Sequence, residues 1–142
     1  MKKILSLVLI SFLCLGASSA TFASNDGQRL FVSLTSDNLN RAAMAVSISN
    51  KVLSTGSISA TIYLSAQGVR WVDKNIPQNT YVNGKTIPEM LKEFMAAGGK
   101  VILCKMCMEN VGGIKPGEVI EGVELTGVLD AMFAENTTVL TY

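Results

Sequence analysis

Two cysteines three positions apart, Cys104 and Cys107, are the residues of this sequence whose type and spacing could do chemistry. They follow directly after an apolar run at residues 100–103. A strand that ends at Cys104 can aim its sulfur at the backbone N–H groups of a helix start, and such donors lower the pKa of a thiol. Lys105 would add positive charge if it points toward the sulfur. The thiolate is the nucleophilic form, so the spacing indicates thiol chemistry, with Cys107 in reach to close a disulfide.

Three interpretations of this pair stay open at the level of the residues. A structural disulfide suits an oxidising compartment, although so short a ring contributes little chain entropy. Reactive thiol work, meaning sulfur transfer or thiol–disulfide exchange, is the second. Soft-metal binding is the third, because Met106 and Met108 would add thioether ligands that suit Cu(I), unless they fill the core. A zinc site would need four ligands, and outside the N-terminal segment with Cys14 the chain offers these two cysteines and no histidine, unless subunits share the ion.

The composition excludes several other classes of function. The sequence contains no histidine, so a Ser-His-Asp or Cys-His mechanism within the chain is impossible. Without the two lysines of the N-terminal segment, ten basic and eleven acidic side chains remain. A chain so close to neutral, with sparse aromatic residues, has no general attraction for nucleic acid or for an anionic membrane. We therefore expect no nucleic-acid partner.

Residues 1–23 have the three-part layout of a secretory signal peptide. Lys2 and Lys3 precede an apolar run over residues 4–15, and small residues lead to a cut expected after Ala23. The run is shorter than the ~20 residues that a spanning helix needs. We predict export to the periplasm, one mature domain over residues 24–142, and no membrane association after cleavage.

The remaining sequence alternates between strand and helix patterns. Polar residues at 35–38 begin a helix whose apolar face runs to Leu53, and Thr86 with Glu89 forms a capping box for a second helix that ends at Gly98. Residues 69–83 suggest a short helix and a loop, residues 108–111 a short helix, residues 117–126 a short strand or an extended loop, and residues 129–133 a final helix. Strands are predicted at residues 30–34, 59–64, 100–103 and 137–141. This order predicts a parallel sheet covered on both faces.

Open parallel sheets place ligands at the carboxyl ends of their strands. Two loops qualify here, at residues 35–38 and 104–107. In the first, Asn38 and Arg41 are candidate contacts for an anion or another ligand, against the alternative that they are a helix cap and a surface charge. We expect Tyr63 and Trp71 to serve packing.

Several segments resemble the DsrE/DsrF-like family (DsrE, YchN-type). Residues 104–112 (CKMCMENVG) are similar to its cysteine loop, residues 30–43 (LFVSLTSDNLNRAA) to its first strand and helix start, residues 62–69 (IYLSAQGV) to its second strand, and residues 125–142 to its closing helix and strand. The resemblance implies a flavodoxin-like three-layer α/β sandwich with a mostly parallel sheet of four to five strands. It also implies homotrimers or homohexamers. Cys104 would be the residue that receives a persulfide from a donor protein and passes it to an acceptor, with Cys107 as the second cysteine.

Taken together, these observations predict an exported protein with a sulfur-carrier or thiol-redox role at Cys104 and Cys107. The export signal departs from cytoplasmic sulfur relays and gives more weight to redox or binding roles. The alternatives are a non-enzymatic module that binds Cu(I) or a small ligand, and a structural oligomeric protein whose two thiols form a disulfide. No organic cofactor is implied.

Overall fold

Four parallel strands form one sheet in the order β3-β2-β1-β4. The computed structural model describes residues 27–142, so the predicted signal peptide and its cleavage site lie outside the described residues. The strands are β1 (Arg29–Leu34), β2 (Ser59–Leu64), β3 (Lys100–Leu103) and β4 (Thr137–Thr141). The α/β class with a parallel sheet is thus confirmed, and the sheet has four strands.

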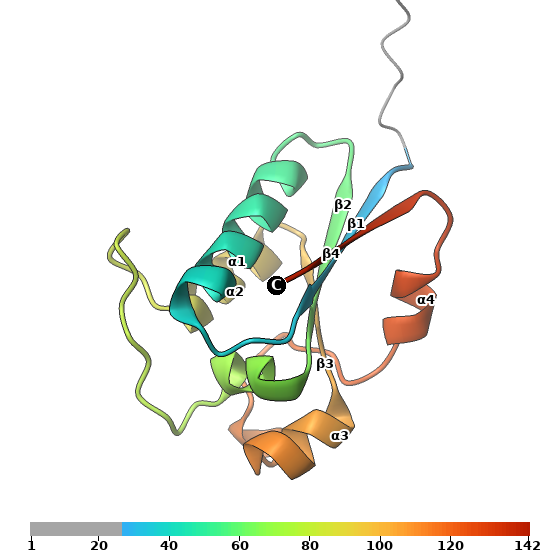
Figure 1. The fold of residues 1–142 in the computed structure, drawn as a ribbon. Helices are drawn as coiled ribbons and strands as arrows, with labels where there is room; N and C mark the ends of the chain where they lie inside the picture. Colours follow the sequence, from blue (N-terminus) through green and yellow to red (C-terminus); the bar gives the residue numbers. More distant parts are fainter. Residues whose placement is uncertain (1–26) are drawn as a thin grey trace, which may run out of the picture.

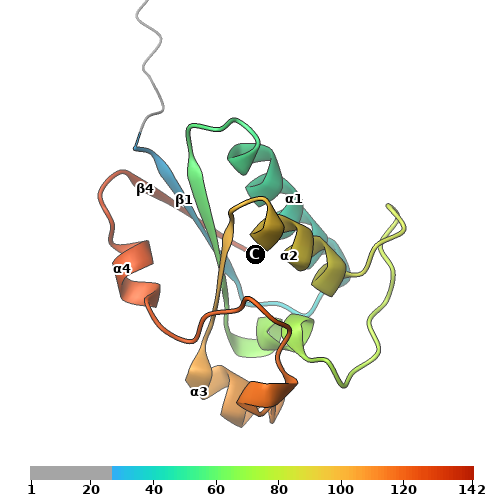
Figure 2. The same ribbon diagram turned by 180° about the vertical axis from the view of Figure 1, so that it is seen from behind.

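Helices cover both faces of this sheet. The helices α1 (Leu39–Leu53) and α2 (Ile87–Ala96) lie side by side on one face, while the short α4 (Val128–Met132) lies on the other (Figures 1 and 2). Both long helices begin where the sequence predicts. The side chain of Asn38 caps α1, and Thr86 and Glu89 form the reciprocal capping box of α2. The predicted three-layer sandwich is confirmed.

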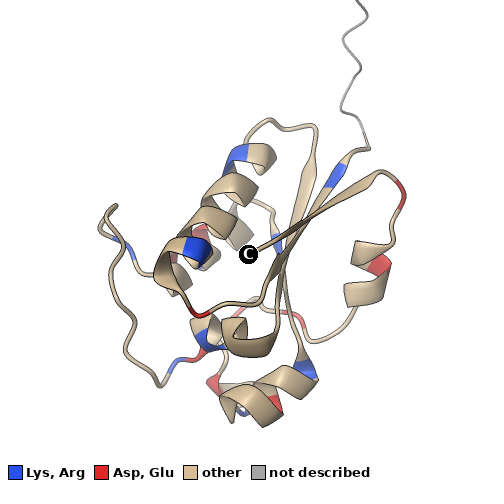
Figure 3. Cartoon of the chain, viewed as in Figure 1, with Lys and Arg blue, Asp and Glu red and all other residues tan. Residues whose placement is uncertain are grey.

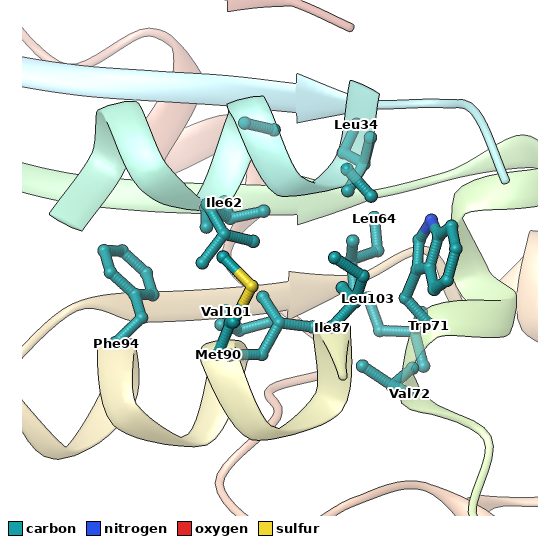
Figure 4. Packing of buried hydrophobic residues seen from close by; sticks show 14 of the residues in the cluster. Leu34, Ile62, Leu64, Trp71, Val72, Ile87, Met90, Phe94, Val101 and Leu103 are labelled. Carbon is teal, nitrogen blue, oxygen red and sulfur yellow. The ribbon is translucent and has the colours of Figure 1, made fainter. Parts of the chain in front are cut away.

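The main core lies between the sheet and the two long helices. Alternate residues of each strand point to this layer because side chains in a strand alternate between faces. Figure 4 shows Ile62, Leu64 and Leu103 of the sheet packed against Ile87, Met90 and Phe94 of α2. The intervening strand residues point to the opposite face, where Phe31 and Ile102 are buried as well. The sheet therefore has an apolar layer on each side, as a parallel sheet requires.

Four short helical segments join the main elements. They are the 3₁₀ helix η1 (Ala66–Val72), the turn of α-helix α3 (Lys105–Cys107), the π-helix η2 (Met108–Gly112) and the 3₁₀ helix η3 (Pro116–Glu118). The segment at residues 117–126 begins with the end of η3, continues as a loop and forms no strand of the sheet. Its Glu124 nevertheless accepts a hydrogen bond from the N–H of Leu103 at 2.8 Å and donates one to the carbonyl of Val101 at 2.9 Å. This loop therefore covers the outer edge of β3.

At the opposite edge, β4 pairs with β1 on one side and with no described strand on the other. Within residues 27–142, no helix combines the length and the apolar character that crossing a membrane requires.

Candidate functional site at the Cys104–Cys107 turn

The turn that carries both cysteines begins where β3 ends. Leu103 is the last residue of β3 and pairs with Leu64 of β2. The N–H of Cys104 then donates to the carbonyl oxygen of Leu64 at 2.9 Å, so the neighbouring strand fixes the point at which the chain leaves the sheet. The backbone of Cys104 is still extended, and Cys104 is the N-cap residue of α3. Its carbonyl oxygen accepts the N–H of Met108 at 2.8 Å, which closes the first helical turn.

Cys104 and Cys107 are free thiols, and both are partly exposed. The Sγ atom of Cys104 accepts a hydrogen bond from the N–H of Cys107 at 3.3 Å, as a capping side chain does. Partial burial of Cys104 raises its pKa. Hydrogen bonds from the Cys107 thiol, the Tyr63 hydroxyl and the backbone N–H groups of Cys107 and Met106 outweigh that burial, and the pKa of Cys104 is lowered overall. Lys105 is exposed and is not among the groups that lower it.

The second thiol has the opposite character. Burial raises the pKa of Cys107, and the hydrogen bond that its thiol gives to Cys104 raises it further. One donor opposes these effects, because the N–H of Ala66 interacts with the sulfur of Cys107. The two cysteines therefore differ in acidity although they are one helical turn apart. Cys104 is the thiol that ionises first, while Cys107 holds its proton.

Tyr63 is a site residue that the sequence did not reveal. Its pairing with Ile102 of β3 places it on the same face of the sheet as Cys104, and its hydroxyl is one of the groups that lower the pKa of the Cys104 thiol. The pKa of Tyr63 is raised well above its usual value, first by burial and then by this hydrogen bond and the charges of both thiols. Its ring also packs against Phe31, with ring centroids 6.0 Å apart. The predicted packing role thus describes the ring alone.

The corner that follows β2 forms the other wall of the site. Ala66 has a φ of +46°, in the left-handed region that non-glycine residues rarely occupy. Gly68 lies so close to the end of β1 that a Cβ atom there would overlap the carbonyl oxygen of Leu34. The N–H of Gly68 donates to the carbonyl oxygen of Thr35 at 3.1 Å. The corner is thereby held against β1, with the N–H of Ala66 presented to Cys107.

Asn38 and Arg41 lie at the start of α1, after β1, whereas the cysteine turn follows β3, and β2 lies between these two strands. The Oδ1 atom of Asn38 accepts the N–H groups of Asn40 and Arg41 at 3.1 and 3.2 Å, so this side chain is occupied as a helix cap. Arg41 is exposed, and among the described residues no hydrogen bond or ion pair joins either residue to the cysteines. Their role as ligand contacts stays a prediction. Basic and acidic residues are interspersed over the fold (Figure 3).

Metal ligands around the turn are few. In residues 27–142, no group of three or more Cys, Asp or Glu side chains is placed to hold a metal ion. Of the two methionines, Met108 is fully buried in the core, which agrees with the simpler expectation, whereas Met106 is 69% exposed. Trp71 is buried, as expected for a packing residue, and its indole N–H donates to the carbonyl oxygen of Ser36 at 2.8 Å.

Comparisons with known proteins give one family and one fold. A sequence model of the DsrE/DsrF-like family matches residues 28–142. No curated protein sequence matches the chain. The structure is similar to a protein of unknown function, MTH1491, from Methanobacterium thermoautotrophicum, with a TM-score of 0.66 and 13% identity over 81% of this chain and 99% of that one. It is also similar to the ychN protein from E. coli, with a TM-score of 0.58 and 20% identity over 81% of this chain and 98% of that one. At these identities the structural likeness concerns the fold.

Proposed function

This chain belongs to the DsrE/DsrF-like family, and from that premise we propose that it is an exported protein whose Cys104 carries sulfane sulfur or exchanges disulfides, with Cys107 as the resolving thiol. The observation that carries the proposal is the geometry of two free thiols at one helix start, where the N–H of Cys107 donates to the Sγ atom of Cys104 at 3.3 Å. Cys104 combines a lowered pKa with partial exposure and a backbone N–H at its sulfur, whereas the pKa of Cys107 is raised. That combination suits one attacking thiolate and one waiting thiol.

Loading of Cys104 would follow ordinary thiol exchange. The Cys104 thiolate attacks the outer sulfur of a persulfide donor R–S–SH and forms a bond to it, and the S–S bond of the donor breaks. The donor leaves as the thiolate R–S⁻, and Cys104 becomes a persulfide whose outer sulfur keeps the proton. Cys107, once deprotonated, can attack the Sγ atom of Cys104, which gives the Cys104–Cys107 disulfide and releases HS⁻. An acceptor thiolate that attacks the outer sulfur instead takes the sulfur away and regenerates the Cys104 thiolate.

The test is peptide mass spectrometry after the full chain has been exposed to a small-molecule persulfide. Trypsin cuts after Lys105, so the two cysteines fall in different peptides. We expect one added sulfur atom on the Cys104 peptide of Cys107→Ser, and in the wild type either that adduct or the Cys104–Cys107 disulfide that follows its resolution, with no added sulfur at residue 107 when Cys104 is intact. The variant Cys104→Ser should lose the modification. If Cys104 of folded Cys107→Ser gains no sulfur and forms no mixed disulfide with a small disulfide, the proposal is wrong.

Assembly and location are part of the same proposal. We place the protein in the periplasm after cleavage of residues 1–23, as a homotrimer or homohexamer that exchanges sulfur with a donor or acceptor protein. Three large apolar side chains on α4, its C-cap and β4 support self-association, since Leu129, Phe133 and Val139 are 64%, 77% and 48% exposed. The free edge of β4 carries no charged residue between Thr137 and Thr141, so a second copy would meet no like charge there.

A further inference from the structure

We propose that Tyr63 is a functional residue of this site: its hydroxyl donates a hydrogen bond to the Sγ atom of Cys104 and stabilises that sulfur as the leaving group when carried sulfur passes to an acceptor thiol. The role of Tyr63 in releasing carried sulfur rests on the proposed function. The hydrogen bond from Tyr63 to the Cys104 sulfur concerns the resting protein and can be tested alone.

The strand register places the two side chains together. Tyr63 of β2 lies opposite Ile102 of β3, and the N–H of Cys104 is bonded to the carbonyl oxygen of Leu64. Side chains two positions apart on a strand share a face, so Cys104 follows Ile102 onto the face that Tyr63 occupies. Leu64, which follows Tyr63, and Leu103, which precedes Cys104, point into the main core instead. The position of Tyr63 beside the thiol is therefore set by backbone pairing.

Packing limits the movement of the phenol. Phe31 of β1 is fully buried on this same face, and its ring lies 6.0 Å from that of Tyr63 with an angle of 36° between the planes. Tyr63 itself is only partly buried, and no protein group other than Cys104 bonds to its hydroxyl among the described residues. A ring supported by Phe31 holds a hydroxyl beside the thiol at little further cost in side-chain entropy.

The position of the donor decides which step it favours. The N–H of Cys107 donates to the Sγ atom of Cys104 itself at 3.3 Å, and the hydroxyl of Tyr63, from the same face of the sheet, would donate to that same atom and not to an attached second sulfur. During discharge, the acceptor thiolate forms a bond to the outer sulfur, the bond from that sulfur to Sγ breaks, and its electron pair stays on Sγ. Two donors at Sγ stabilise the charge as it develops there. A leaving thiol with a lower pKa departs faster, so Tyr63 promotes discharge.

The first experiment measures the pKa of Cys104 through the pH dependence of its alkylation by iodoacetamide, read on the tryptic peptide that ends at Lys105. In Tyr63→Phe the ring remains and the hydroxyl is lost. We expect the pKa of Cys104 to rise by about one unit, which is roughly tenfold less thiolate at a pH below both values. Tyr81→Phe is the matched control, because Tyr81 is also partly buried but lies in the loop before α2, and it should leave the pKa unchanged. An unchanged pKa in folded Tyr63→Phe overturns the inference.

A second measurement covers the case in which Tyr63→Phe does not fold. Replacement of Tyr63 by a fluorinated tyrosine keeps the ring and makes the hydroxyl a stronger hydrogen-bond donor, so it should lower the pKa of Cys104 in the same alkylation measurement. A pKa of Cys104 that is unchanged or raised in this protein would contradict the contact between the side chains.

The discharge step is measured on protein loaded with one sulfur atom. We expect Tyr63→Phe to transfer sulfur to a small thiol about three- to tenfold more slowly than the wild type. Equal discharge rates overturn the assignment of Tyr63 to this step. If the wild type cannot be loaded at all, the sulfur-carrier function fails, while the shift in the pKa of Cys104 still tells whether Tyr63 donates to the thiolate.

Discussion

Two residues at the corner after β2 should respond in opposite directions to small substitutions. Gly68→Ala would place a Cβ atom against the carbonyl oxygen of Leu34, and neither backbone segment can move without disturbing β1. We expect it to lower the free energy of unfolding by about 1–3 kcal/mol. Ala66→Gly relieves a left-handed backbone and should raise that free energy by about 0.5–1 kcal/mol. Urea denaturation of both variants tests this, and a stable Gly68→Ala would contradict the close approach.

The sequence predicts residues whose role depends on local spacing, but it does not predict residues whose role depends on contacts between neighbouring strands. The spacing of Cys104 and Cys107 and the Thr86–Glu89 box are visible in a few consecutive letters, and the structure contains both the turn and the box. Tyr63 meets Cys104 only because β2 lies next to β3. Strand order cannot be read from the pattern of one strand, so the tyrosine looked like an ordinary packing residue. Nor does alanine signal a left-handed corner, as glycine at position 66 would.

The N-terminal capping box of α2 should make the stability of the protein depend on pH. The carboxylate of Glu89 accepts the N–H of Thr86 at 2.7 Å and its hydroxyl at 2.8 Å, and the bond from the backbone N–H is the main cause of a lowered pKa. A carboxyl whose pKa is lower in the folded state stabilises the fold above its unfolded pKa, near 4.5, and loses that contribution as the pH falls through the folded value.

The corresponding prediction concerns Glu89→Gln. The variant should be less stable than the wild type at pH 7, and the two should converge as the pH falls through the lowered pKa of the folded carboxyl, where the wild-type side chain is protonated too. Thermal unfolding over a pH series measures the difference. Glu109→Gln is the matched control, since Glu109 is exposed and accepts no side-chain hydrogen bond within the described part of the chain. A stability difference that stays constant from pH 7 to pH 3 would show that the capping carboxylate is not its source.

Hydrophobic patterns in the sequence predict an element only where that element buries an apolar stripe. Strong hydrophobic spacing located β1, α1, β2, α2 and β3 to within a residue or two, because each buries a continuous apolar stripe. The segment at residues 117–126 has no such stripe. It pairs through backbone groups of Glu124 with the edge of β3, and the Glu124 carboxylate also lies 2.9 Å from the Nζ atom of Lys100, contacts that no local pattern in the segment indicates. The sequence alone therefore does not decide whether this segment is a strand or a loop, because its contacts depend on which strand forms the edge of the sheet.

On the scale of the whole molecule, the two layers of the sandwich differ in depth. The layer under α1 and α2 contains most of the fully buried side chains, whereas α4 has five residues and leaves Leu129 and Phe133 mostly exposed. Local opening costs least where few apolar contacts are lost. In a single subunit, we therefore expect the amides of α4 and the outer edge of β4 to exchange with solvent much faster than those of β1 and β2.

That difference makes hydrogen exchange a test of the proposed assembly. If several copies associate through the exposed side chains of α4 and β4, raising the protein concentration should slow exchange in residues 128–141 and leave β2 unchanged, because a contact protects only the amides whose opening it opposes. Phe133→Ser should remove the concentration dependence and reduce the mass measured by light scattering, without altering alkylation of Cys104. Wild-type protein that is a trimer or hexamer while α4 exchanges at the rate of a free subunit would place the contact on another face.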